Sequence, residues 1–210
     1  MAYLDELIFR RRSVRKFKPN LPPAEWIENM VLCGARSPSP RNSQPVRFIR
    51  LESAQPREKL HDAMNEGRQR LLSQIEQTGG SKRLRNYVNS YFRFSEFMFE
   101  APVLMCLGTS AERNGRENVH LGASEIDDPG CKRRDMDITV GLAANGYLLK
   151  GEELGLASCI LTAPLLYINR PEFVLGLDGI DIRCFIVSGW RAEEPLTLER
   201  KSTAEIYWVL

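Results

Sequence analysis

The chain has 210 residues, a hydrophobic content of 43% and nearly balanced charge, with 29 basic and 27 acidic residues. This length and composition are typical of a globular protein with a sizeable core, and we expect one domain over residues 1–210. A net charge of +2 gives no nucleic-acid signature for the whole protein. We also expect no membrane association, because no apolar run approaches the roughly 18 residues of a span and charges interrupt the N-terminus before a signal peptide could form.

The periodicity predicts helices mixed with short strands. Helices are expected over about residues 3–11, from Pro22-Pro23 to Pro38, and over 56–77, 84–99, 134–153 and 164–174. Strands are expected over 46–51, 101–107, 157–161 and 182–187. Because these elements follow no regular βαβ repeat, the predicted fold class is α+β.

Residues 109–133 differ from the rest of the chain. They hold three glycines, many charges and little apolar periodicity. About 25 residues without an element is long for a compact domain, so we expect a mobile lid or loop here.

The cysteines and histidines indicate no metal site. The five cysteines are widely spaced without a C-x-x-C pair, and two histidines are too few for a zinc cluster. Cys33, Cys106, Cys159 and Cys184 stand in apolar surroundings, which predicts buried thiols. We therefore expect a reducing, cytoplasmic location.

A basic run near the N-terminus is the first candidate site. It contains Ser13 and six cations: Arg10, Arg11, Arg12, Arg15, Lys16 and Lys18. Arginine forks pair with phosphate oxygens in two-point geometry, and a hydroxyl adds a further hydrogen bond. A solvated face or a nucleic-acid patch is the alternative, and we favour a solvated face for Arg12, Lys16 and Lys18.

An amide-rich turn is the second candidate. Asn42 and Gln44 lie in a stretch bounded by Pro38, Pro40 and Pro45. Amides both donate and accept, which suits a heteroaromatic ring with alternating N–H and C=O groups, although Asn and Ser also favour turns for local reasons. A phosphate clamp followed by an amide turn suggests a mononucleotide cofactor.

Together these stretches resemble the flavin-dependent nitroreductase family, which has an Arg-x-Ser-x-Arg/Lys pattern followed by a Pro-Ser-x-x-Asn-Ser-Gln-Pro turn. Two later blocks also fit: residues 137–149 with their continuation to Cys159, and residues 189–195 with Arg200-Lys201. The resemblance extends over about residues 3–205. It implies a central, mainly antiparallel sheet flanked by helices. It also implies an intertwined homodimer in which a C-terminal arm, residues 195–210, crosses to the partner.

The resemblance further implies a bound FMN and assigns residues to it. Arg11 and Ser13 match the phosphate contacts, Arg12 belongs to the same basic run, and Arg200 with Lys201 matches the C-terminal cations that reach the phosphate. Arg15 matches the cation beside the pyrimidine edge of the flavin. The amides Asn42 and Gln44, and more weakly Ser39, match contacts to the ring and the ribityl chain. Thr162 and Ala163 stand where the family has two glycines near flavin N5.

The predicted activity is reduction of nitroaromatics, quinones or related small electrophiles by NAD(P)H through the flavin, without a catalytic side chain. Val46, Arg41 and Thr162-Ala163-Pro164 depart from the family pattern, which leaves the electron acceptor open. The alternatives are a dehalogenase-like or flavin-consuming role on the same fold, an FMN- or partner-binding protein with little turnover, and a nucleic-acid binder that uses the basic N-terminus.

Overall fold

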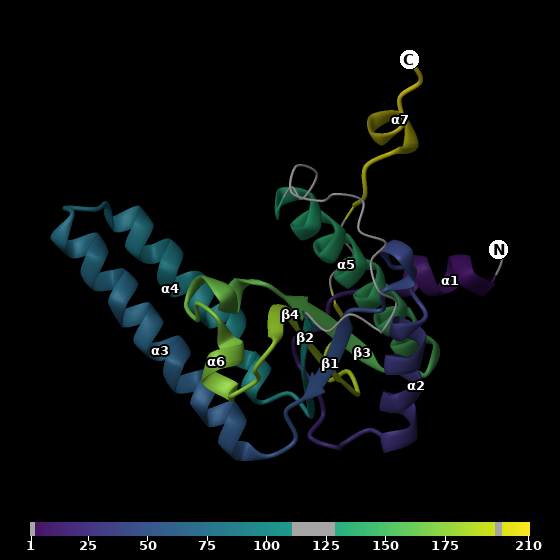
Figure 1. The fold of residues 1–210 in the computed structure, drawn as a ribbon, viewed down its shortest axis with the longest axis horizontal. Helices are drawn as coiled ribbons and strands as arrows, with labels where there is room; N and C mark the ends of the chain where they lie inside the picture. Colours follow the sequence, from purple (N-terminus) through teal and green to yellow (C-terminus); the bar gives the residue numbers. More distant parts are fainter. Residues whose placement is uncertain (1–2, 111–128, 196–198) are drawn as a thin grey trace, which may run out of the picture.

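The computed structural model describes residues 3–110, 129–195 and 199–210, which form an α+β fold (Figure 1). The helices are α1 (Tyr3–Arg10), α2 (Ala24–Ala35), α3 (Ala54–Gln77), α4 (Lys82–Glu96), α5 (Pro129–Glu153), α6 (Pro171–Leu175) and α7 (Thr203–Ile206). The strands are β1 (Val46–Arg50), β2 (Val103–Ser110), β3 (Ala157–Leu161) and β4 (Ile180–Gly189). Short 3-10 helices are η1 (Pro40–Asn42), η2 (Phe97–Phe99) and η3 (Ala163–Leu166). None of the described helices is long and apolar enough to cross a membrane.

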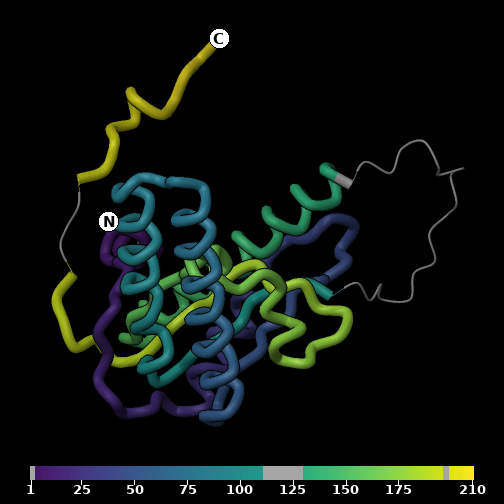
Figure 2. The backbone as a smooth tube through the Cα atoms, turned by 90° about the vertical axis from the view of Figure 1, so that its left-hand side faces the viewer, coloured from purple at the N-terminus to yellow at the C-terminus, as the bar shows by residue number. Residues whose placement is uncertain are grey.

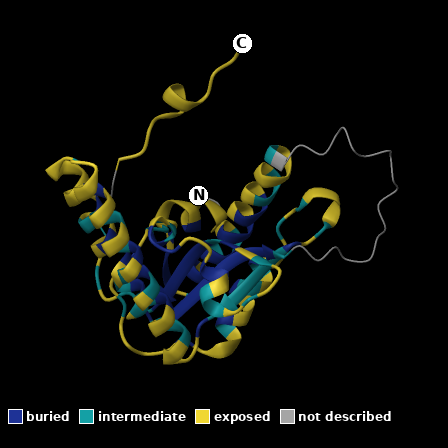
Figure 3. Ribbon diagram, turned by 60° about the vertical axis from the view of Figure 1, so that its left-hand side comes forward, coloured by how far each residue is buried: buried dark blue, intermediate teal, exposed yellow. Residues whose placement is uncertain are grey.

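The four strands form one antiparallel sheet in the order β1-β2-β4-β3, which confirms the predicted fold class and sheet. Successive side chains of a strand point to opposite faces. Accordingly Leu104 and Cys106 of β2 pack against α3 and α4, whereas Val103, Met105 and Leu107 pack against α2 and α5. The molecule therefore has three layers, with buried strands between two layers of helices (Figure 3).

Helices α2 and α5 approach closely at small residues. A Cβ atom on Gly146 would lie 2.9 Å from the Cys33 carbonyl oxygen, and one on Gly34 would lie 2.7 Å from that of Ala143. Gly141, on the other hand, meets nothing within 4 Å. The close contact between α2 and α5 thus requires glycine at positions 146 and 34, whereas position 141 could hold a larger residue.

The predicted helix over 164–174 is wrong, because the chain breaks it into η3 and α6. Arg170 adopts a left-handed conformation with φ of 71° directly before Pro171. Proline disfavours helical geometry in the residue before it and lacks an N–H, so a helix cannot run through this point. The Arg170 guanidinium stacks on the Phe173 ring at 4.0 Å and pairs with Glu172 at 3.2 Å, which fixes the new start.

The expected lid over 109–133 is wrong at both ends. Thr109 and Ser110 belong to β2, where they pair with Asp181 and Ile180 of β4. Helix α5 begins already at Pro129, a residue suited to a first helical turn because its missing N–H needs no partner there. The remainder of the predicted lid, residues 111–128, lies outside the described residues.

All five cysteines are free thiols. Cys106, Cys159 and Cys184 are buried as predicted, whereas Cys33 is only half-buried and Cys131 is exposed. Burial raises the pKa of both Cys106 and Cys184 to about 12, so these two thiols are unreactive packing groups.

Candidate functional site

Residues 11–15 run beside the edge strand β3. Ser13 forms a parallel bridge with Ser158, and the Val14 amide donates to the Ser158 carbonyl at 3.2 Å. Val14 is completely buried. Because alternate residues of an extended segment point in opposite directions, Ser13 and Arg15 face outward and are exposed.

Arg11, Ser13 and Arg15 lie along the segment that runs beside β3, where the bridge to Ser158 places Ser13 next to the strand and Arg11 and Arg15 flank it two residues away. Burial raises the pKa of the Cys159 thiol, and the opposing, pKa-lowering influences are the charge of Arg15, a hydrogen bond with Ser13 and the charge of Arg11. Three predicted cofactor residues are thus neighbours in space. We call Arg11, Ser13 and Arg15 the clamp.

Arg12 is used locally. Its Nη1 donates to the carbonyl oxygens of Phe9 at 2.5 Å and Arg11 at 2.8 Å, so the guanidinium folds back on the end of α1. Sequence reasoning grouped Arg12 with the cofactor residues, but the structure gives its side chain a backbone partner. Lys16 pairs with Glu193 at 3.7 Å.

Two more predicted residues lie at the far end of the same edge strand. Thr162 directly follows the strand and Ala163 begins η3, with Thr162 exposed and Ala163 half-buried. The Leu165 amide donates to the Thr162 carbonyl at 3.0 Å, which fixes the turn. The clamp and this turn therefore share one edge of the sheet.

The amide turn is strained. Arg41, Asn42 and Gln44 have φ values of 54°, 54° and 47°, a region that residues other than glycine rarely adopt. The Gln44 amide donates to Ser39 Oγ at 2.9 Å, which helps to hold this shape. The side chains of Asn42 and Gln44 are exposed. Strained, exposed polar residues of this kind concentrate at functional sites.

Within one chain the amide turn lies far from the clamp. The strand register places Ser158 in line with Ser188 and Val103 at one end of the sheet, and Val46, which follows the turn, in line with Thr109 at the other end. The two groups are six residues apart along the strand direction, which corresponds to about 20 Å. Across the sheet they are separated by four strand spacings, from β1 to Ser13, which correspond to about 19 Å. The two groups occupy opposite corners, a separation greater than the length of one FMN molecule.

Arg200 and Lys201 lie on the C-terminal segment, which leaves the body of the molecule in Figures 1 and 2. Both residues are exposed. Over the described ranges they have no ion pair with the body, so a single chain does not bring them to the clamp.

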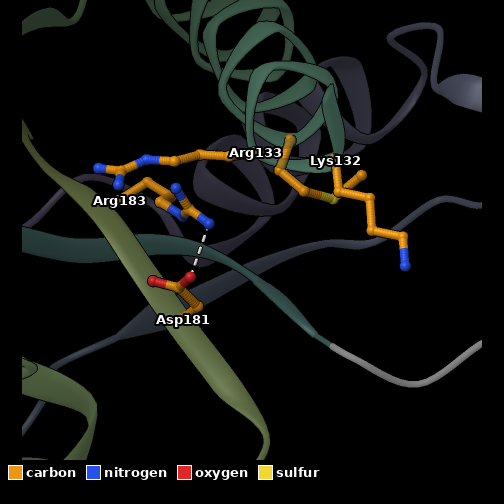
Figure 4. Close-up of a pocket in the computed structure, with 5 residues that line it drawn as sticks. Lys132, Arg133, Asp181 and Arg183 are labelled. Carbon is orange, nitrogen blue, oxygen red and sulfur yellow. Dashed lines mark hydrogen bonds and ion pairs between the residues drawn. The ribbon is translucent and has the colours of Figure 1, made fainter. Parts of the chain in front are cut away.

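Two surface cavities lie elsewhere. One of about 450 Å³ is lined by Lys132, Arg133 and Met136 of α5 and by Asp181 and Arg183 of β4 (Figure 4). Arg183 is held there by Asp181 at 2.6 Å and Asp137 at 2.9 Å. Another of about 620 Å³ lies between α3 and α4 around His61. Neither cavity is lined by a residue predicted to bind the cofactor.

The sequence did not identify a buried carboxylate behind the clamp. Glu152 is 3% exposed and accepts from Arg10 Nε at 2.8 Å and Arg191 Nη2 at 3.3 Å. The available signal was a charged residue at the end of an apolar helix, but two adjacent glutamates there suggest only a solvated helix end. Which of the two is buried depends on the packing of α1 on α5.

Comparison with known proteins identifies the fold and the family. A BluB-like flavoprotein from Clostridium difficile superposes with a TM-score of 0.80 at 23% identity over 100% of both chains. A nitroreductase with bound FMN from Desulfitobacterium hafniense gives a TM-score of 0.70 at 17% identity, again over 100% of both chains. An NADPH:FMN oxidoreductase from Vibrio harveyi, solved with NAD+, gives 0.70 at 15% identity over 98% of this chain and 76% of its own.

The fold is thus that of nitroreductase-like flavoproteins. A model of the nitroreductase family matches residues 8–190, and the chain belongs to this family.

Proposed function

We propose that the protein is an FMN-dependent oxidoreductase that uses NAD(P)H to reduce small electrophiles such as nitroaromatics and quinones. The observation that carries this proposal is the clamp beside β3, where Arg11 and Arg15 flank Ser13 along a segment that is bridged to Ser158 of the edge strand. Family membership and the FMN named for one structural relative agree with it.

The residues present fit FMN at this edge. Arg11 and Ser13 would bind its phosphate. Neither Arg11 nor Arg15 has a carboxylate partner among the described residues, so both guanidinium groups are available to a ligand. Arg15 would lie at the pyrimidine edge, where a fixed cation stabilises negative charge on the reduced ring. Thr162 and Ala163 would line the ring at the end of β3. When bound, FMN supplies the hydride chemistry, and the side chains bind and orient it.

The opposite corners of the sheet imply a site made by two chains. In a homodimer, Ser39, Asn42 and Gln44 of a second copy would complete the site that the clamp of the first copy begins. The exposed arm would carry Arg200 and Lys201 to a phosphate. This arrangement accounts for an amide turn that is strained and exposed yet remote from its own clamp.

Two measurements test the proposal. The purified protein should be yellow, and flavin released by acid should be FMN by chromatography; FAD, or no flavin even after reconstitution, contradicts the cofactor. NADH and NADPH oxidation should then be followed with a panel of nitroaromatic, quinone and halogenated aromatic acceptors. An FMN-loaded protein that oxidises neither nucleotide would instead be a flavin-binding protein with little turnover.

A further inference from the structure

Glu152 links three separate parts of the chain behind the clamp. It lies in the last turn of helix α5, and its Oε1 accepts from Arg10 at the end of α1 and from Arg191, two residues after β4. Arg10 Nη2 also donates to the Glu152 backbone carbonyl at 2.9 Å, so this guanidinium grips both the side chain and the backbone of one residue.

A buried carboxylate requires such partners. Removing a charge from water is costly unless it is paired and hydrogen-bonded, and the C-terminal end of a helix disfavours a negative charge further. Both costs apply to Glu152, since it is 3% exposed and lies in the last turn of α5. The two guanidinium groups compensate for them, and they thereby fix the ends of α1 and β4 against α5.

The segments that carry Arg10 and Arg191 also fix the two ends of the clamp. Residues 16–18 pair with residues 190–192, through Lys18 N to Trp190 O at 2.8 Å and Ala192 N to Lys16 O at 3.0 Å. The Arg15 amide donates to Glu193 Oε1 at 3.1 Å. Arg10 anchors the N-terminal side of residues 11–15, and the strand-like pairing with residues 190–193 anchors the C-terminal side.

This network also sorts the cations of the basic run. Glu152 engages Arg10, backbone carbonyls engage Arg12, and Glu193 engages Lys16. The guanidinium groups of Arg11 and Arg15 are left beside β3 without a carboxylate partner among the described residues. Glu152 and Glu193 therefore neutralise Arg10 and Lys16, and they leave the charges of Arg11 and Arg15 unpaired among the described residues.

We infer that Glu152 is a positioning residue for phosphate recognition: by binding Arg10 and Arg191 it sets the backbone of residues 11–15, so that Arg11 and Ser13 face the FMN phosphate. The inference rests on the proposed function. The phosphate is the part of FMN that depends on the clamp, and riboflavin has the same ring without it.

The test compares FMN and riboflavin binding by fluorescence titration of flavin-stripped protein. Glu152→Gln should raise the Kd of FMN at least tenfold and that of riboflavin less than threefold. The matched control is Glu153→Gln, the adjacent carboxylate that bonds Tyr3 and Lys150 on the exposed side. It should leave both constants within a factor of three.

A purely structural role would lower the melting temperature without changing the ratio of the two affinities. If Glu152→Gln does not fold, Glu152→Asp, which keeps the charge but shortens the side chain, is used for the same comparison. An unchanged ratio of the two constants overturns the inference. Wild-type protein that binds no FMN refutes the proposed function instead, so the two failures are distinguishable.

Discussion

Arg11 and Arg200, which lie near opposite ends of the chain, are both proposed to bind the FMN phosphate. Charge-assisted hydrogen bonds contribute about 1.5–3 kcal/mol each. We expect Arg11→Ala and Arg200→Ala each to weaken FMN binding by about 10- to 150-fold, measured as Kd by fluorescence titration. Lys18→Ala, which removes an exposed cation from the same basic run, is the control and should have little effect. Unchanged constants for both arginine variants would contradict the phosphate assignment.

Arg15 should act on the redox chemistry more than on binding. Two-electron reduction places negative charge near N1 and the C2 oxygen of a flavin, and a fixed cation there stabilises the reduced state. Arg15→Gln should therefore lower the reduction potential of bound FMN, measured by spectroelectrochemistry, with a smaller change in Kd. A potential equal to that of the wild type would mean that Arg15 lies away from the pyrimidine edge.

At the scale of elements, Gly67 of α3 sets the position of η3. A Cβ atom at this position would lie 2.0 Å from the Tyr167 carbonyl oxygen, so α3 would have to move away from the turn that carries Thr162 and Ala163. Tyr167 also donates to the Val88 carbonyl at 2.6 Å, which connects this turn to α4.

Gly67→Ala should destabilise the fold by about 1–3 kcal/mol despite the better helix propensity of alanine. For a chain of this length each kcal/mol corresponds to about 2–4 °C in melting temperature. Ser73→Ala, at an exposed position of the same helix, should leave the melting temperature nearly unchanged. A Gly67→Ala protein as stable as the wild type would show that α3 and η3 can separate freely.

Elements whose sequence signal lies within the element itself could be predicted, and elements that depend on distant contacts could not. The apolar spacing of α3 and the small residues of α5 are local, and both helices were predicted. The break at Arg170 was missed because a left-handed arginine is stabilised by Phe173 and Glu172, contacts that periodicity does not encode. The strand at Thr109-Ser110 was missed because its pairing with β4 joins residues some 70 positions apart.

For the whole molecule, the motifs predicted candidate residues of the site but not their arrangement within one chain. The family resemblance predicts an intertwined homodimer, but the strand order β1-β2-β4-β3 is needed to see that the clamp and the amide turn are separated within one chain. This order results from long-range pairing. Glu152 was missed for the same reason, since its partners Arg10 and Arg191 come from distant segments.

The exposed apolar surface of the chain favours an obligate homodimer. Ile206, Tyr207, Trp208, Val209 and Leu210 are each at least 67% exposed, and the segment that carries them leaves the body (Figure 1). Leu4 and Ile8 of α1 and Ile138 and Leu142 of α5 are exposed at one-turn spacing on their helices. Contiguous apolar patches above a few hundred Å² are rare on monomers.

Deleting residues 203–210 tests whether the arm joins two subunits. This truncation removes the apolar residues but keeps Arg200 and Lys201, so a loss of FMN would follow from lost subunit contact and not from lost charge. We expect light scattering to show a larger monomer fraction and the monomer to be colourless, because each site would need the amide turn of a second copy. Trp208→Ala, which removes the largest side chain of the arm, should produce a smaller shift in the same direction. A truncated monomer that retains FMN would contradict the two-chain site, and a full-length monomer that retains it would contradict the dimer itself.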